Sequence, residues 1–329
     1  VKGGMDMKLS RKYAGLIASA GSVTAAVLGI DYLHRLASSR TAPKMKVVSQ
    51  TQQAVNGGRS NFTGVISEGY GWLSHTPSEK IYITSFDGLR LCGHLITHPA
   101  ARRTVLFMHG FRSSWQHDFG AAAKDLYDAG CNLLFAEQRA HGESEGKYIT
   151  YGIYERFDCA EWFNCISRRF GSLPAYGDGI SMGATTVLMA TGLKLPGCVK
   201  GIIADCGFTS PKAIMTSVFR QHSKLPAWLV IPEVSLYSRL RAGFSFSDYS
   251  TLDAMRVNTL PIFFAHGDAD DFVPLSMTIE NYQACKAPKY LLVVPGAGHG
   301  MSYLIDHDTY LESLLNFFDD CEKSDSDMK

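Results

Sequence analysis

The stretch Tyr176-Gly-Asp-Gly-Ile-Ser-Met-Gly-Ala-Thr-Thr-Val-Leu-Met-Ala190 places Ser181 between Gly179 and Gly183, where an expected strand meets an expected helix. Such a turn holds the serine in a strained conformation that lifts its hydroxyl clear of the sheet, and the glycines let strand and helix approach closely. A G-x-S-x-G pattern alone is a weak signal, because five positions match by chance in many chains. Its meaning depends on the sequence around it.

Short apolar runs alternate with helical stretches on both sides of Ser181. Residues 81–85 and 89–97 alternate around Asp87-Gly88, which predicts an antiparallel hairpin. Further strands are expected over residues 104–108, 132–136, 175–180, 199–205, 261–265 and 290–294. Helices are expected over residues 119–129, 151–170, 275–286 and 308–318 and directly after Ser181. This order predicts an α/β fold whose mostly parallel sheet is covered by helices on both faces.

Two segments interrupt this alternation. Residues 208–257 contain apolar helical stretches without a convincing strand, so we expect a short helical cap there. Residues 31–79 show little periodicity and many turn formers, so we expect a leader that packs on the domain. The predicted organisation is an N-terminal apolar helix and leader (1–64), a core (65–207 and 258–329) and a cap insertion (208–257).

The composition is that of an ordinary globular protein. The 329 residues are 46% hydrophobic and 19% charged, and the formal net charge is +1. Basic residues are dispersed, so we expect no nucleic-acid partner. Eight cysteines without a C-x-x-C pair, several inside apolar runs, are interpreted as small buried side chains rather than a disulfide framework. The sequence leaves the oligomeric state open.

The N-terminus is ambiguous. Lys8, Arg11 and Lys12 precede an uncharged run over residues 13–30, whose 18 residues reach only the lower edge of a membrane span. A membrane anchor or uncleaved signal, a helix docked on the domain, and a cleaved signal all remain open. Localisation is therefore either cytoplasmic or membrane-anchored through this segment. We also expect the natural start at Met5 or Met7.

A serine nucleophile needs a histidine to take its proton and a carboxylate to orient that histidine. Two later strand ends supply both. His266-Gly-Asp-Ala-Asp-Asp-Phe-Val-Pro274 follows the strand ending at Ala265, and His299 follows the strand ending at Val294. The order serine, acid, histidine is expected when three strand ends of one parallel sheet converge. The acid is Asp268, Asp270 or Asp271.

Taken together, these motifs resemble the α/β-hydrolase superfamily, and within it bacterial serine hydrolases related to the acyl-peptidase-like esterases. The resemblance covers residues 65–320. It rests on segments 109–111, 137–146, 179–183, 266–274 and 298–299. It implies a catalytic triad of Ser181, Asp270 and His299, because the family pattern H-G-x-x-D-x-x-V-P puts the acid at Asp270. It also implies an oxyanion hole formed by the backbone N–H groups of Phe111 and Met182.

Other polar residues receive structural interpretations. His109 and His266 each precede a glycine at a strand end and are expected to brace loops, and His141 is expected to lie in a structural turn. The remaining histidines show no metal-ligand spacing, so we expect no metal and no cofactor. Asp178 is unexpected in a buried strand before the serine, and the sequence offers no account of it.

The cap is expected to supply the substrate surface. Trp115, Phe219 and Trp228 are candidate pocket residues, although the cap side chains could instead bury only one another. The resulting hypothesis is an esterase whose partner is a small-molecule ester with an apolar acyl or alcohol group of small to medium size. An aminopeptidase or thioesterase with the same triad, and a non-catalytic binding module of the same fold, remain alternatives.

Overall fold

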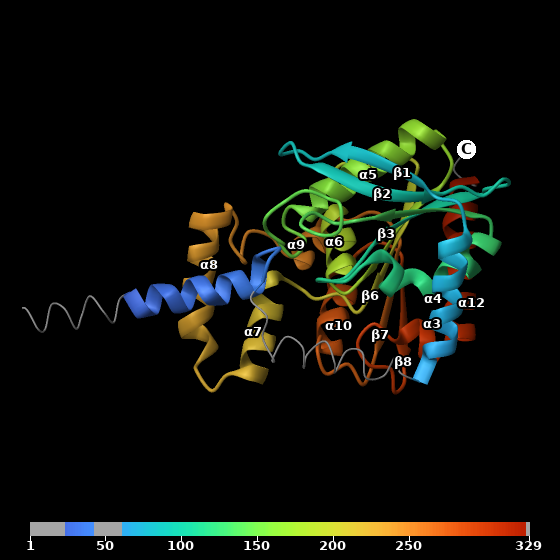
Figure 1. Ribbon diagram of the computed structural model, residues 1–329. Helices are drawn as coiled ribbons and strands as arrows, with labels where there is room; N and C mark the ends of the chain where they lie inside the picture. Colours follow the sequence, from blue (N-terminus) through green and yellow to red (C-terminus); the bar gives the residue numbers. More distant parts are fainter. Residues whose placement is uncertain (1–23, 43–60, 327–329) are drawn as a thin grey trace, which may run out of the picture.

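The computed structural model describes residues 24–42 and 61–326 (Figure 1). Its centre is an eight-stranded sheet in the order β1-β2-β4-β3-β5-β6-β7-β8. The strands are β1 (Glu79–Thr84), β2 (Arg90–Ile96), β3 (Arg103–Met108), β4 (Cys131–Ala136), β5 (Ala175–Ile180), β6 (Val199–Asp205), β7 (Ile262–Gly267) and β8 (Lys289–Val294). β2 is antiparallel to both β1 and β4, and the other neighbours are parallel. The predicted α/β fold and its opening hairpin are confirmed.

Helices cover both faces of this sheet. One face packs against α5 (Glu155–Phe170), α6 (Met182–Ala190), α9 (Thr251–Val257) and α10 (Leu275–Ala284). The other face packs against α3 (Thr63–His75), α4 (Trp115–Asp128) and α12 (His307–Ser326), with the short α11 (Ser302–Ile305) before α12. Both faces of β3 and β4 are therefore buried, which explains their continuous apolar runs.

The N-terminal region differs from the expected leader. A helix spans residues 24–38, and α3 packs against α4 as part of the core layer. The predicted boundary at residue 64 is wrong, since it falls inside α3. Three glycines obscure this helix in the sequence, but one of them, Gly69, lets α3 approach the backbone of α4 at Gly120.

Part of the predicted N-terminal segment lies outside the described residues. This applies to residues 13–23 of the uncharged run and to the expected start at Met5 or Met7. Over 24–42 and 61–326, no helix has the length and apolar character needed to cross a bilayer.

The insertion between β6 and β7 contains three helices. α7 (Pro211–His222) and α8 (Ala227–Ala242) pack against each other and, with the helix over residues 24–38, project to one side of the sheet (Figure 1). In contrast, α9 packs against α6 and α10. The helical hairpin that stands off the body is thus shorter than the expected cap of residues 208–257.

All eight cysteines are free thiols, and seven of them are buried. Cys92, Cys131, Cys159 and Cys206 are wholly inaccessible to solvent. This agrees with their interpretation as small core side chains.

The turn between β5 and α6 depends on two glycines. A Cβ atom on Gly183 would overlap the carbonyl of Met108 in β3, and one on Gly179 would overlap the backbone of Gly183. Strand and helix can therefore meet only if both positions lack a side chain.

Gly183→Ala should lower the free energy of unfolding by about 3 kcal/mol or more, because backbone must move to admit the methyl group. Gly71→Ala in α3 is the matched control: nothing lies near its Cβ position, and alanine favours a helix by about 1 kcal/mol. Urea unfolding of both variants measures the difference. Equal midpoints for Gly183→Ala and wild type would contradict this account of the turn.

Candidate active site

The predicted serine occupies the strained turn between β5 and α6. Ser181 has φ 58° and ψ −115°, a conformation that residues with side chains rarely adopt. Its N–H donates to the carbonyl of Asp205 (2.8 Å), and its own carbonyl accepts from the N–H of Thr185 (3.0 Å). These bonds to β6 and α6 hold the strained residue in place.

The structure brings the three predicted side chains together. Nε2 of His299 lies 2.9 Å from Oγ of Ser181, and Nδ1 of His299 lies 2.7 Å from Oδ2 of Asp270. All three residues are less than 10% exposed. This arrangement can take the hydroxyl proton onto His299 while the carboxylate holds the ring in the required tautomer.

Asp270 is positioned by several donors. Its Oδ1 accepts the N–H groups of Phe272 (2.9 Å) and Val273 (2.8 Å), and its Oδ2 also lies 3.1 Å from Nε2 of His266. Burial alone would raise the pKa of Asp270, but the hydrogen bonds from His266 and His299 hold it well below its ordinary value. The carboxylate therefore stays ionised at neutral pH.

The neighbouring acids lie elsewhere. Asp268 and Asp271 are exposed, and Oδ1 of Asp268 accepts the N–H of Gly296 (2.7 Å). Of the three candidates, Asp270 is the one in contact with His299. His266 was expected only to brace a loop, yet it also touches this carboxylate, a contact that its position in the sequence does not reveal.

Two backbone N–H groups remain available beside the serine. Met182 is the first residue of α6, where an N–H has no partner within the helix, and Phe111 follows the end of β3. Neither N–H donates to a described residue, whereas the N–H of Arg112 donates to Nε2 of His141 (3.0 Å). Phe111 and Met182 thus fit the predicted oxyanion hole, and Arg112 does not.

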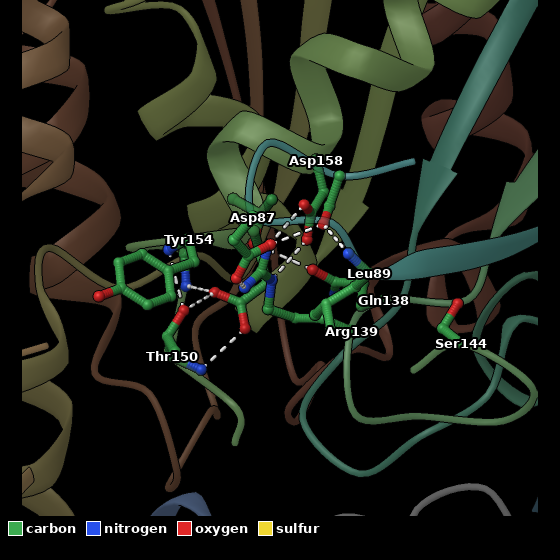
Figure 2. Close-up of polar contacts among 12 residues, drawn as sticks. Asp87, Leu89, Gln138, Arg139, Ser144, Thr150, Tyr154 and Asp158 are labelled. Carbon is green, nitrogen blue, oxygen red and sulfur yellow. Dashed lines mark hydrogen bonds and ion pairs between the residues drawn. The ribbon is translucent and has the colours of Figure 1, made fainter. Parts of the chain in front are cut away.

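A buried ionic network shapes the loop between β4 and α5, as Figure 2 shows. The guanidinium of Arg139 forms a fork with Asp158 (2.6 and 2.7 Å) and also binds Asp87 (3.0 and 3.1 Å). The loop it anchors carries Tyr151, whose ring stacks on Phe111 with centroids 5.3 Å apart. Sequence analysis missed Tyr151, because only tertiary structure brings this loop to the oxyanion residue.

Comparison with known proteins shows which families and structures this chain resembles. The chain matches the family model described as Hydrolase_4, serine aminopeptidase, S33, over residues 99–258. It is 28% identical over 243 residues to the uncharacterized protein YqkD of Bacillus subtilis, covering 74% of this chain and 79% of that one. It is 24% identical over 272 residues to human alpha/beta hydrolase domain-containing protein 17B, covering 78% and 82%. The expected resemblance to α/β hydrolases is therefore confirmed over about three quarters of the chain.

Solved structures show the same fold. The esterase Pf2001 of Pyrococcus furiosus superposes with a TM-score of 0.62 at 24% identity, over 74% of this chain and 91% of that one. Est1E of Butyrivibrio proteoclasticus, solved with bound ferulic acid, gives 0.55 at 19% identity over 74% and 99%. The predicted α/β-hydrolase fold is thereby confirmed, and the sheet is the element that this chain shares with these structures.

The predicted pocket residues need correction. Trp115 is buried between α4 and the sheet, stacked on His94 and Phe135, and so does not line the site. Trp228 is 77% exposed on α8, opposite the buried face of that helix. Phe219 packs on the apolar cluster of the cap, and its role in substrate binding stays a prediction. Helical spacing alone did not reveal which way these side chains point.

Some metal-ligating side chains of the α/β hydrolase lie close together. Cys92, His94 and Glu137 form one such group, a C-x-H spacing that the sequence analysis overlooked. Nε2 of His94 lies 3.0 Å from the Glu137 carboxylate, and burial raises the pKa of the Cys92 thiol to about 11. In this structure the histidine and the carboxylate are paired with each other.

Asp178 lies behind the serine turn, on the face of the sheet that packs against α4 and α12. It lines a cavity of about 30 Å³ that is also bordered by Phe119, Asp205 and Tyr310. A cavity of this size holds one water molecule. Burial, and secondarily the charge of Asp205, raise the pKa of Asp178 well above its ordinary value, so the carboxyl is buried in its neutral form.

Asp178→Asn should become progressively more stabilising as pH rises above about 4. The unfolded wild type releases this proton above its ordinary pKa, whereas the folded protein retains it. Wild-type stability therefore falls by up to about 1.4 kcal/mol per pH unit from this group, and the amide variant avoids the loss. Urea unfolding between acidic and neutral pH tests this, with the exposed Asp271→Asn as control. Parallel pH profiles for wild type and Asp178→Asn would rule it out.

Proposed function

We propose that this α/β hydrolase cleaves carboxylic esters through an acyl-enzyme on Ser181. The observation that carries the proposal is the continuous hydrogen-bonded line from Oγ of Ser181 through His299 to Asp270. The solved esterases that share the fold agree with it. The family model's description as a serine aminopeptidase keeps peptide or amide bonds as the second candidate.

In the proposed reaction each residue has a role in forming and then hydrolysing the acyl-enzyme. Oγ of Ser181 attacks the ester carbonyl carbon while Nε2 of His299 takes its proton, and Asp270 stabilises the resulting imidazolium. The carbonyl oxygen becomes an anion and is bound by the N–H groups of Phe111 and Met182. The alcohol then leaves with the proton from His299. Water repeats the sequence on the acyl-enzyme and releases the acid.

Ser181→Ala should lower kcat by about 10⁶, because the three side chains act as a unit. A panel of p-nitrophenyl esters with short and long acyl chains measures this. Aminoacyl p-nitroanilides assayed alongside distinguish the aminopeptidase, and acyl thioesters the thioesterase. Full ester hydrolysis by Ser181→Ala would dismiss the serine as nucleophile. Failure of the folded wild type to react with a fluorophosphonate probe would favour a binding module.

Asp270→Asn should lower kcat by about 10⁴, because an amide stabilises the wrong tautomer of His299 and cannot offset its positive charge. Asp271→Asn is the matched control one residue away, with an exposed side chain, and should leave kcat unchanged. Both variants are assayed on the best ester from the panel. Comparable kcat values for the two would exclude Asp270 as the triad acid.

A further inference from the structure

The cap hairpin exposes a continuous apolar stripe on its outer side. Large apolar side chains recur at helical spacing along one face of α8 and at Leu225, just before the helix. This face lies opposite the buried Ile231 and Val234. The most exposed members of the stripe are Leu225 (61%), Trp228 (77%), Leu229 (54%), Leu236 (57%) and Leu240 (76%). Soluble monomers rarely leave so many neighbouring large side chains uncovered.

The charge of this hairpin is also unusual. Residues 211–242 contain five lysine and arginine residues and one glutamate, a formal charge of +4 in a chain whose total is +1. Four of these cations make no ion pair with any residue in the described ranges: Lys212, Arg220, Lys224 and Arg241. Of these cations, Lys212 lies next to Leu236 of the stripe. An apolar stripe beside a cation without an ion pair is complementary to an anionic lipid surface.

A hollow of about 270 Å³ adjoins the stripe. Lys212, Arg239 and the hydroxyl-bearing Ser235 and Ser245 line it together with Leu236 of the stripe. Arg239 is held by Asp248, which leaves Lys212 as the unpaired cation of the hollow. The ammonium group of Lys212 and the serine hydroxyls can donate hydrogen bonds to the phosphate of a phospholipid, while the Leu236 side chain contacts its acyl chains.

The beginning of the described chain lies on the same side of the molecule. The hydroxyl of Tyr237 in α8 donates to Asp31 in the helix over residues 24–38 (2.7 Å), so the two helices are neighbours (Figure 1). That helix also exposes Val27, Leu28 and Tyr32. Residues 13–23, which precede it, carry no charge and follow Lys8, Arg11 and Lys12.

We propose that the outer face of α8 docks on the surface of a membrane containing anionic phospholipid. The stripe enters the boundary between headgroups and acyl chains, and the cations bind phosphate groups. α8 then lies in the plane of the interface without crossing it, as expected for a helix whose outer face is apolar and flanked by basic residues. This docking does not depend on which bond the active site cleaves.

Vesicle flotation of the full chain tests the proposal. We expect binding to vesicles of phosphatidylcholine mixed with phosphatidylglycerol, and weaker binding to phosphatidylcholine alone or at high salt. Leu229→Ser/Leu236→Ser/Leu240→Ser should weaken binding about tenfold or more, because these side chains no longer enter the acyl region. Val65→Ser/Val257→Ser/Ile305→Ser, at exposed apolar positions on α3, α9 and α11, is the matched control and should bind as wild type.

Trp228 provides a readout at the surface itself. It is the one exposed tryptophan of the four, so brominated phosphatidylcholine in the vesicles should quench its fluorescence on binding. Vesicle binding without this quenching would assign the membrane contact to residues 13–23 and overturn the proposal. Absence of binding to the anionic vesicles would also overturn it. Light scattering without lipid tests a second occupant of this face. A dimer that the triple serine variant abolishes would also overturn the proposal. Unchanged far-UV circular dichroism and an unchanged urea midpoint show that the variants are folded.

Discussion

The close approach of β5 and α6 at Gly179 and Gly183 is the constraint on which the site depends. Because the first residues of α6 lie directly against the carbonyl end of β3, Ser181 must turn with positive φ and its hydroxyl stands above the sheet edge. The same contact places the N–H of Met182 at the start of a helix, where it has no partner within the helix. One packing requirement thus positions both the proposed nucleophile and a proposed donor for the oxyanion.

The parallel sheet then positions Asp270 and His299, the proposed partners of Ser181. β5, β6, β7 and β8 are consecutive neighbours, so the loops that follow them meet at one edge. Asp270 follows β7 and His299 follows β8. β6 lies between β5, which leads to Ser181, and β7, and it ends at Asp205. The carboxylate of Asp205 accepts a hydrogen bond from the hydroxyl of Ser302 (2.9 Å), three residues after His299. This bond ties the histidine loop to the strand that also binds the N–H of Ser181.

The predictable features were those encoded locally. Strand ends followed by glycine, serine, acid or histidine can be recognised in the sequence, so the sheet and the three residues that the structure brings together were foreseen. The directions in which the side chains of Trp115 and Trp228 point could not be predicted, because helical spacing does not say which face of a helix meets the sheet. α3 was missed because its three glycines weaken helix propensity, although one of them, Gly69, is needed for the contact with α4. Asp178 faces a small cavity that only tertiary structure creates, so the sequence could not place it.

The helix over residues 24–38 is joined to the loop that carries Phe111, the proposed oxyanion donor. Arg112, directly after Phe111, has φ 53° and donates from its guanidinium to the carbonyls of Leu36 (3.0 Å) and Ser39 (2.9 Å). A strained residue keeps its conformation only where its surroundings hold it. The loop that carries Phe111 is therefore shaped partly by a segment that precedes the region matched by the family model. Because the same helix contacts α8 through Tyr237, the outer surface of the cap and the N–H of Phe111 are linked by one continuous set of contacts.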